Sequence, residues 1–131
     1  MTKPNEVKSR SSSIQKSIRL CALNAIPQNS TNGFLLQSDR GRYGVMVIRR
    51  EAESLFIYVN SCPHIGTPLD LRPGNFLNRD KTYILCSTHG ALFRIEDGYC
   101  VSGPCAGEHL IALPWELRGN EVFITEPAFT K

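Results

Sequence analysis

Residues 62–66 read Cys-Pro-His-Ile-Gly, and residues 86–90 read Cys-Ser-Thr-His-Gly. These two segments hold two of the five cysteines and two of the three histidines in the 131-residue chain. In each, a histidine follows a cysteine by two or three positions, and a glycine comes soon after. Thiolates and imidazoles are protein ligands of zinc and of iron–sulfur centres. The repeated pair therefore predicts a metal site.

The order of residues within the segments bears on which metal they bind. A zinc site of two cysteines and two histidines usually takes both cysteines from one segment and both histidines from another. Here each segment supplies one of each. That arrangement suits a two-iron cluster with two thiolates on one iron and two imidazoles on the other. The alternative is a single zinc ion in a zinc-stabilised binding module without a redox role.

Short apolar and β-branched runs, separated by turn residues, occur along the chain from residue 18 onward. This spacing predicts an all-β fold, a small antiparallel β-sandwich or barrel, and no long helix. Both cysteine–histidine segments directly follow such runs, so we expect them in loops at strand ends. The expected strands are residues 18–23, 34–37, 43–49, 55–59, 83–85, 92–95, 110–113 and 122–125, with residues 27–33 as a loop.

The two segments resemble the ligand loops of the Rieske 2Fe-2S family. The family pattern is Cys-x-His-x-Gly, then Cys-x₂-His-Gly, then a Gly-Pro loop that covers the cluster, here Gly103-Pro104. The resemblance spans residues 55–124 and implies a Rieske iron–sulfur domain with a two-loop cluster-binding subdomain. It also implies one Rieske-type 2Fe-2S cluster, with Cys62 and Cys86 on one iron and His64 and His89 on the other.

The residues beside the ligands indicate the low-potential ferredoxin type. High-potential respiratory members of the family have an extra cysteine in each ligand loop, and the corresponding residues here are Thr67 and Thr88. They also carry two hydroxyl side chains that bond the cluster sulfurs, where this chain has Ala91 and Phe93. Fewer hydrogen bonds leave the more negative, reduced state less stabilised. The segment between the two ligand loops is longer than is typical of that type, and we expect the extra residues within 71–80. In this respect the chain departs from the low-potential ferredoxin pattern.

The histidine count limits what the protein can catalyse. Rieske oxygenases also need a mononuclear iron held by two histidines and a carboxylate. Once His64 and His89 bind the cluster, His109 alone remains. No dinucleotide-binding fingerprint is present either. We therefore expect no enzyme but a one-electron carrier, which passes electrons from a reductase to an oxygenase or other redox enzyme. The alternative is the small subunit of a reductase complex.

The basic charge of the chain is concentrated near its start. Residues 1–20 carry a formal charge of +4 within a total of +3. We expect a flexible, basic, Ser-rich tail at residues 1–17 and a Rieske domain at residues 18–131, with its cluster-binding part at about 60–106. The chain lacks a basic patch interleaved with aromatic residues, an apolar run of about 18 residues and a secretory signal. We accordingly expect a cytoplasmic monomer without a nucleic-acid partner or membrane span.

The remaining cysteines are expected to be buried thiols. A chain without a secretory signal favours metal ligands or free thiols over a disulfide framework. Cys100 and Cys105 flank the Gly103-Pro104 loop and are expected as small apolar side chains beneath it. The alternatives are a disulfide between them or a role in tuning the cluster. Cys21 is expected in the core, and His109 in an exposed loop.

Overall fold

The computed structural model describes residues 17–38, 41–63, 68–70, 74–87 and 90–125. One 3-10 turn, η2 (Leu23–Ala25), is the only helical segment among these residues. No helix in the described part of the chain has the length and apolar character needed to cross a membrane. The strands are β2 (Ser17–Ala22), β3 (Ser30–Ser38), β4 (Gly41–Arg49), β5 (Leu55–Val59), β6 (Tyr83–Leu85), β7 (Leu92–Arg94), β8 (Cys100–Ser102), β9 (Trp115–Arg118) and β10 (Glu121–Thr125).

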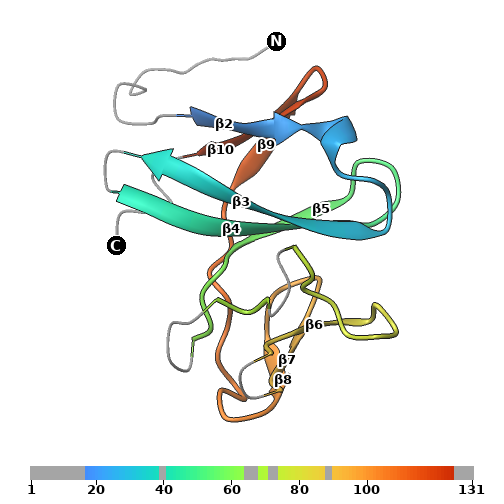
Figure 1. The fold of residues 1–131 in the computed structure, drawn as a ribbon, viewed down its shortest axis with the longest axis vertical. Helices are drawn as coiled ribbons and strands as arrows, with labels where there is room; N and C mark the ends of the chain where they lie inside the picture. The colour runs from blue at the N-terminus through green and yellow to red at the C-terminus, as the bar shows by residue number, and fades with distance from the viewer. Residues whose placement is uncertain (1–16, 39–40, 64–67, 71–73, 88–89, 126–131) are drawn as a thin grey trace.

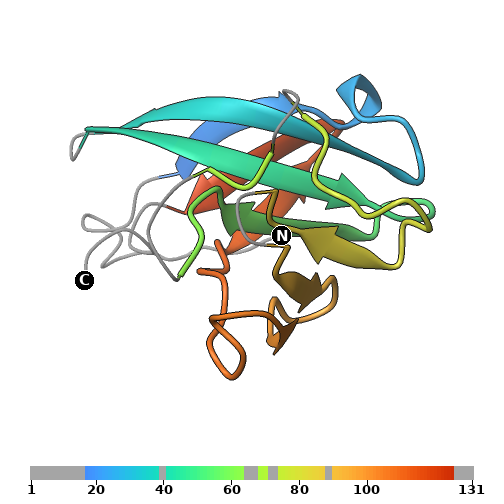
Figure 2. The ribbon, with the colours of Figure 1, turned by 60° about the horizontal axis from the view of Figure 1, so that its bottom comes forward.

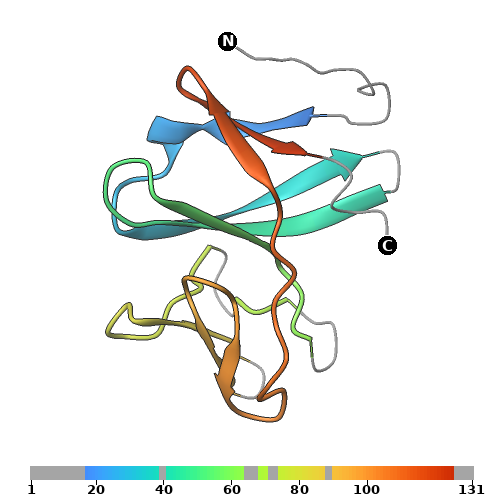
Figure 3. The same ribbon diagram turned by 180° about the vertical axis from the view of Figure 1, so that it is seen from behind.

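The strands form three antiparallel sheets with the orders β2-β10-β9, β3-β4-β5 and β6-β7-β8. The first two sheets make the upper body of the molecule in Figure 1, and the third makes a smaller lobe below it. Seen from behind in Figure 3, the segment that leads from β8 to β9 runs back from this lobe to the body. Hydrogen bonds from Val59 N to Ile111 O (2.9 Å) and from Leu113 N to Ile57 O (3.0 Å) attach that segment to β5. The expected all-β, antiparallel architecture is confirmed.

Strand β4 separates two hydrophobic cores. Val45 and Val47 face the core shared with the β2-β10-β9 sheet, whereas Met46 and Ile48 face the core shared with the lobe. All four side chains have an exposed fraction of 0%. Burial on both faces explains why four apolar residues follow one another, where a half-exposed strand would alternate with polar residues. Figure 2 shows β3 and β4 crossing the molecule, and the lobe packs on the face of β4 that carries Met46 and Ile48.

Parts of the expected strand pattern are wrong. Residues 30–33, expected in a loop, begin β3 because they pair with residues 46–49 of β4. Residues 110–113 form no strand, although Ala112 makes an isolated bridge with Tyr58. The expected pattern also lacked β8 and β9, which are three and four residues long and largely exposed or half-exposed. At residues 30–33, pairing with β4 outweighs the local composition. Strands β8 and β9 pair with their near neighbours β7 and β10.

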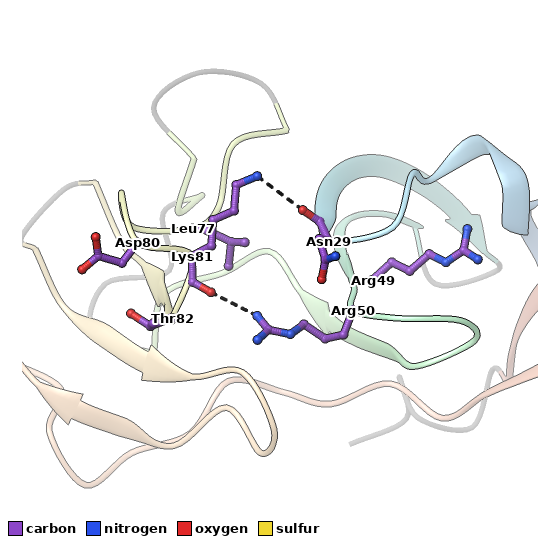
Figure 4. Close-up of a pocket in the computed structure, with 7 residues that line it drawn as sticks. All are labelled: Asn29, Arg49, Arg50, Leu77, Asp80, Lys81 and Thr82. Carbon is purple, nitrogen blue, oxygen red and sulfur yellow. Dashed lines mark hydrogen bonds between the residues drawn. The ribbon is translucent and has the colours of Figure 1, made fainter.

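The segment between the two ligand loops is fastened to the body. Phe76 is completely buried in the core of the lobe, and a Cβ placed on Gly33 of β3 would lie 3.4 Å from its ring. Arg50 donates a hydrogen bond to the carbonyl of Lys81 (3.0 Å), and Lys81 Nζ donates to the carbonyl of Asn29 (3.4 Å). Figure 4 shows both bonds across a hollow of about 250 Å³. The described part of the longer connection therefore joins the lobe to the body.

The expected basic tail at residues 1–17 lies outside the described residues, except for Ser17. That residue begins β2, where it pairs with Thr125 and accepts a hydrogen bond from Arg118 Nη2 (2.8 Å). The domain limits expected from the sequence remain predictions.

Candidate metal centre

The first ligand loop follows β5, and Asn60 closes its base. The Asn60 backbone N–H donates to the carbonyl of Gly44 in β4 (2.8 Å), which fixes the start of the loop. Its side-chain oxygen accepts from Leu69 N (2.8 Å), and its side-chain nitrogen donates to Asp70 Oδ1 (3.0 Å). One amide therefore joins the two ends of the segment that contains Cys62. The sequence analysis did not identify Asn60, since nothing in its local pattern distinguishes it from any loop asparagine.

The second ligand loop follows β6 and turns tightly at Cys86. Cys86 N donates to the carbonyl of Ala91 (2.9 Å), and Gly90 N donates to the carbonyl of Cys86 (2.9 Å). Gly90 has a φ of +73°, a conformation that glycine adopts without steric cost. Cys86 and the two residues after the histidine, Gly90 and Ala91, are thus held at a fixed separation.

Residues Ser87 and Leu69 connect the two loops directly. The Ser87 backbone N–H and hydroxyl both donate to the carbonyl of Leu69, over 2.9 and 2.8 Å. Leu69 is completely buried, so this pair of hydrogen bonds is anchored in the core of the lobe. The second ligand segment is therefore hydrogen-bonded to the end of the first ligand loop.

Cys62 and Cys86 lie in the same core cluster, with exposed fractions of 1% and 0%. Neither forms a disulfide. Two buried sulfur donors on two linked loops fit the thiolate half of a 2Fe-2S site. The other two expected ligands, His64 and His89, lie outside the described residues, so the complete set of four ligands remains a prediction.

The expected cover loop packs closely on the second ligand loop. Gly103 has a φ of +108°, and a Cβ placed there would lie 2.8 Å from the Cα of Ala91. That spacing is too short for any side chain, so the approach of the two backbones requires glycine at this position. The loop begins and ends near Cys100, whose N–H donates to Glu108 O (2.8 Å) and whose carbonyl accepts from Gly107 N (3.0 Å).

Two further cysteines at this loop are buried, as expected. Cys100 and Cys105 are free thiols with exposed fractions of 0% and 1%, and their sulfur atoms are 3.1 Å apart. Burial is the main cause that raises the pKa of Cys105 to about 12, followed by its hydrogen bond and charge interaction with Cys100 and by weaker interactions with Cys62. The alternative of a Cys100–Cys105 disulfide is not what the structure shows.

The environment beside the cysteines is apolar. Ala91 and Phe93, which stand where high-potential Rieske proteins carry hydroxyls, have exposed fractions of 1% and 0% and belong to the same core as Cys62 and Cys86. Away from this region, Cys21 is buried in the second core, as expected. His109 is exposed, also as expected, and its ring contacts Tyr99 edge-on at 5.2 Å.

Comparison with known proteins shows the family to which the chain belongs. The family model of the Rieske [2Fe-2S] domain matches residues 17–118. No curated protein sequence matches the chain significantly.

Solved structures of similar fold include the ferredoxin of carbazole 1,9a-dioxygenase from Nocardioides aromaticivorans IC177. The two chains are 21% identical, with 83% of this chain and 96% of that ferredoxin covered at a TM-score of 0.65. A chain from the complex of reduced oxygenase and oxidized ferredoxin in carbazole 1,9a-dioxygenase is 19% identical, with 82% and 91% covered at a TM-score of 0.62.

The terminal oxygenase of carbazole 1,9a-dioxygenase from Novosphingobium sp. KA1 is also similar, with 19% identity and a TM-score of 0.66. The match covers 82% of this chain but 29% of the oxygenase chain. At these identities the likeness concerns the fold, which occurs both as nearly a whole ferredoxin and as one part of a larger chain. The family match over most of its length shows that this chain belongs to the Rieske [2Fe-2S] domain family, and its cofactor is one Rieske-type 2Fe-2S cluster.

Proposed function

We propose that the protein is a one-electron carrier in which Cys62 and Cys86 bind one iron of the cluster and His64 and His89 bind the other. The bound cluster would accept and release a single electron. The observation that carries the proposal is the burial of Cys62 and Cys86 in one core, on loops joined by Ser87 and Leu69. A rigid, hydrogen-bonded frame suits electron transfer, because little has to rearrange when the charge changes.

The chain's own residues argue against catalysis by the protein alone. The sequence contains three histidines, and two of them are assigned to the cluster. A second iron site with two histidine ligands cannot be assembled from His109 alone. We therefore propose an electron-transfer protein and not a self-contained oxygenase.

The redox partners that we propose are a reductase as electron donor and an oxygenase-like protein as acceptor. Two of the similar structures are named as a ferredoxin of carbazole 1,9a-dioxygenase and as a complex of reduced oxygenase and oxidized ferredoxin in carbazole 1,9a-dioxygenase. The match covers 96% of the first of these, a ferredoxin, which supports a carrier of the same size. We further propose a cytoplasmic monomer, with its domain at residues 18–131 and its cluster-binding part at about 60–106.

We place its reduction potential at the low, ferredoxin-like end of the Rieske range of about −150 to +300 mV. Ala91 and Phe93 have no hydroxyl to donate, and both are buried beside the cysteines. Reduction adds a negative charge, which such an apolar environment stabilises less than hydroxyl donors would.

Anaerobic electron transfer from the reduced protein to an oxidised Rieske oxygenase tests this function. The protein, prepared with ample iron and reduced with dithionite, is freed of reductant and mixed with an oxidised Rieske oxygenase in a stopped-flow spectrometer. A carrier transfers one electron per chain, so its visible absorption returns while that of the oxygenase bleaches. The protein alone with NADH and an aromatic substrate should consume no oxygen.

Two other outcomes would contradict the proposal. A colourless protein with one zinc and no acid-labile sulfide would support the zinc-stabilised binding module. Stoichiometric co-purification with a large flavin or haem subunit from the native host, together with failure to reduce any oxygenase, would support the small subunit of a reductase.

A further inference from the structure

A pair of buried thiols lies beside the proposed cluster without a role in binding it. Cys100 Sγ and Cys105 Sγ are 3.1 Å apart, within hydrogen-bonding distance for sulfur, and either could donate to the other. Both side chains are almost completely buried, and both pack in the same core as Cys62. Buried polar hydrogens generally have an acceptor, so the two thiol protons need to be accounted for.

The Cys100 proton has an acceptor of its own. Cys100 Sγ lies 3.2 Å from the carbonyl oxygen of Ser102, and a carbonyl accepts hydrogen bonds but cannot donate them. With its proton directed to Ser102, the Cys100 sulfur is left as an acceptor. Cys105 is then the thiol whose proton can be directed elsewhere.

Two sulfur atoms compete for the Cys105 proton. One belongs to Cys100. The other belongs to Cys62, which packs in the same core as Cys105 and whose charge and side-chain hydrogen bond contribute to the raised pKa of Cys105. An iron ligand is a thiolate, and a negatively charged acceptor forms a hydrogen bond roughly twice as strong as a neutral one. The bond to Cys62 is therefore favoured once that residue binds iron.

We propose that the Cys105 thiol donates a hydrogen bond to the Cys62 thiolate and thereby raises the reduction potential of the cluster. This inference rests on the proposed function, in which Cys62 is an iron ligand. Reduction places more negative charge on the ligand sulfur, so a donor aimed at it stabilises the reduced state more than the oxidised state. The Cys105 proton stays on its sulfur throughout, and the only net change is the gain of one electron.

The surroundings of Cys105 favour a strong effect. Ala91 and Phe93 are buried in the same core and offer no competing hydroxyl. In an environment of such low polarity, a hydrogen bond is electrostatically stronger than in water. The close packing of Gly103 on Ala91 fixes the cover loop that contains Cys105. Cys105 is thus a positioning and tuning residue, which acts on the cluster through its ligand.

Single substitutions with a matched control test the inference. Cys105→Ala removes the donor and should lower the equilibrium constant for reduction of the cluster about tenfold. For a one-electron couple, this corresponds to a fall of about 59 mV in midpoint potential. Cys105→Ser keeps a donor and should leave the potential equal to that of the wild type or higher. Cys21→Ala removes a buried thiol from the other core and should leave the potential unchanged. Protein-film voltammetry measures all four proteins.

A spectroscopic readout separates hydrogen bonding from packing. In deuterium oxide, exchange of the Cys105 proton should shift an iron–thiolate stretching band in the resonance Raman spectrum of the wild type. The same shift should be absent in Cys105→Ala. If that variant does not retain a cluster, the shift in the wild type and the potential of Cys105→Ser decide the question.

The outcomes distinguish this inference from the proposed function. A wild-type protein without iron and sulfide would refute the proposed function itself. A different result is a wild-type protein that holds a full cluster, has the same potential as Cys105→Ala and shows no shift of its Raman bands in deuterium oxide. That result would overturn only the role of Cys105.

Discussion

The hydroxyl of Tyr58 donates a hydrogen bond to the carbonyl oxygen of Ile95 across 2.6 Å, and this bond joins the body of the protein to its cluster-binding lobe. Tyr58 lies in β5, with an exposed fraction of 2%, and its side chain packs in the core of the lobe. A Cβ placed on Gly98, in the turn before β8, would lie 2.9 Å from its ring. Tyr58 is therefore one of the buried contacts that fix the orientation of the lobe on the β3-β4-β5 sheet.

Replacement of Tyr58 by phenylalanine should lower the free energy of unfolding by about 1–3 kcal/mol, because it leaves the buried carbonyl of Ile95 without its donor. Urea denaturation followed by circular dichroism measures the change. Tyr99→Phe is the control, since Tyr99 is half-buried and a phenylalanine would keep its ring contact with His109. A change in Tyr58→Phe no larger than that in the control would contradict the role of the bond.

The same residue makes stability depend on alkaline pH. Burial, followed by the charges of Asp97 and Glu96, raises the pKa of Tyr58 from 10.0 to about 12. Below pH 10 the phenol is protonated in both the folded and the unfolded state, so its contribution is complete. As the pH rises from 10 to 12 the unfolded state ionises first, and the contribution is lost. The stability difference between wild type and Tyr58→Phe should therefore narrow over this interval, whereas a constant difference would refute the assignment.

Substitution of Gly103 by alanine should release the cover loop. The added Cβ would meet the backbone of Ala91 at 2.8 Å, an overlap whose relief costs about 1–3 kcal/mol. We expect faster loss of visible absorption when the protein is exposed to an iron chelator. Gly107→Ala is a matched control, because Gly107 also has a positive φ, +95°, but has nothing within 4 Å of the added Cβ. Equal rates of cluster loss in the two variants would show that strain, and not contact with Ala91, is responsible.

Asn60 should prove necessary for a stable first ligand loop. Asn60→Ala leaves the N–H of Leu69 without its acceptor and removes the bond to Asp70, at a cost of about 1–3 kcal/mol. Both thermal stability and cluster retention should fall. Asn78→Ala provides the comparison, since Asn78 likewise accepts from Thr82 N and Tyr83 N but in a turn away from the ligand loops. If the two variants lose the cluster equally fast, the hydrogen bonds of Asn60 to Leu69 and Asp70 have no special role in holding it.

The features that were predicted most accurately from the sequence are those that depend on a local pattern of apolar and polar residues. The strands at residues 55–59 and 83–85 have the expected limits, because apolar runs end abruptly there at Asn60 and Cys86. Residues 30–33 carry turn-forming residues yet extend a strand, because their partners in β4 lie outside any local window. The contacts of Asn60 and of Ser87 with Leu69 could not be predicted for the same reason. Each joins residues that are separated along the chain and meet only in the folded lobe.

Pulsed electron paramagnetic resonance of the dithionite-reduced protein tests the central claim most directly. If Cys62 and Cys86 hold one iron and His64 and His89 the other, the reduced cluster is paramagnetic and its spectrum shows hyperfine coupling to two imidazole nitrogens. A reduced protein with no signal, or with a two-iron signal that lacks nitrogen coupling, would contradict the proposed ligands.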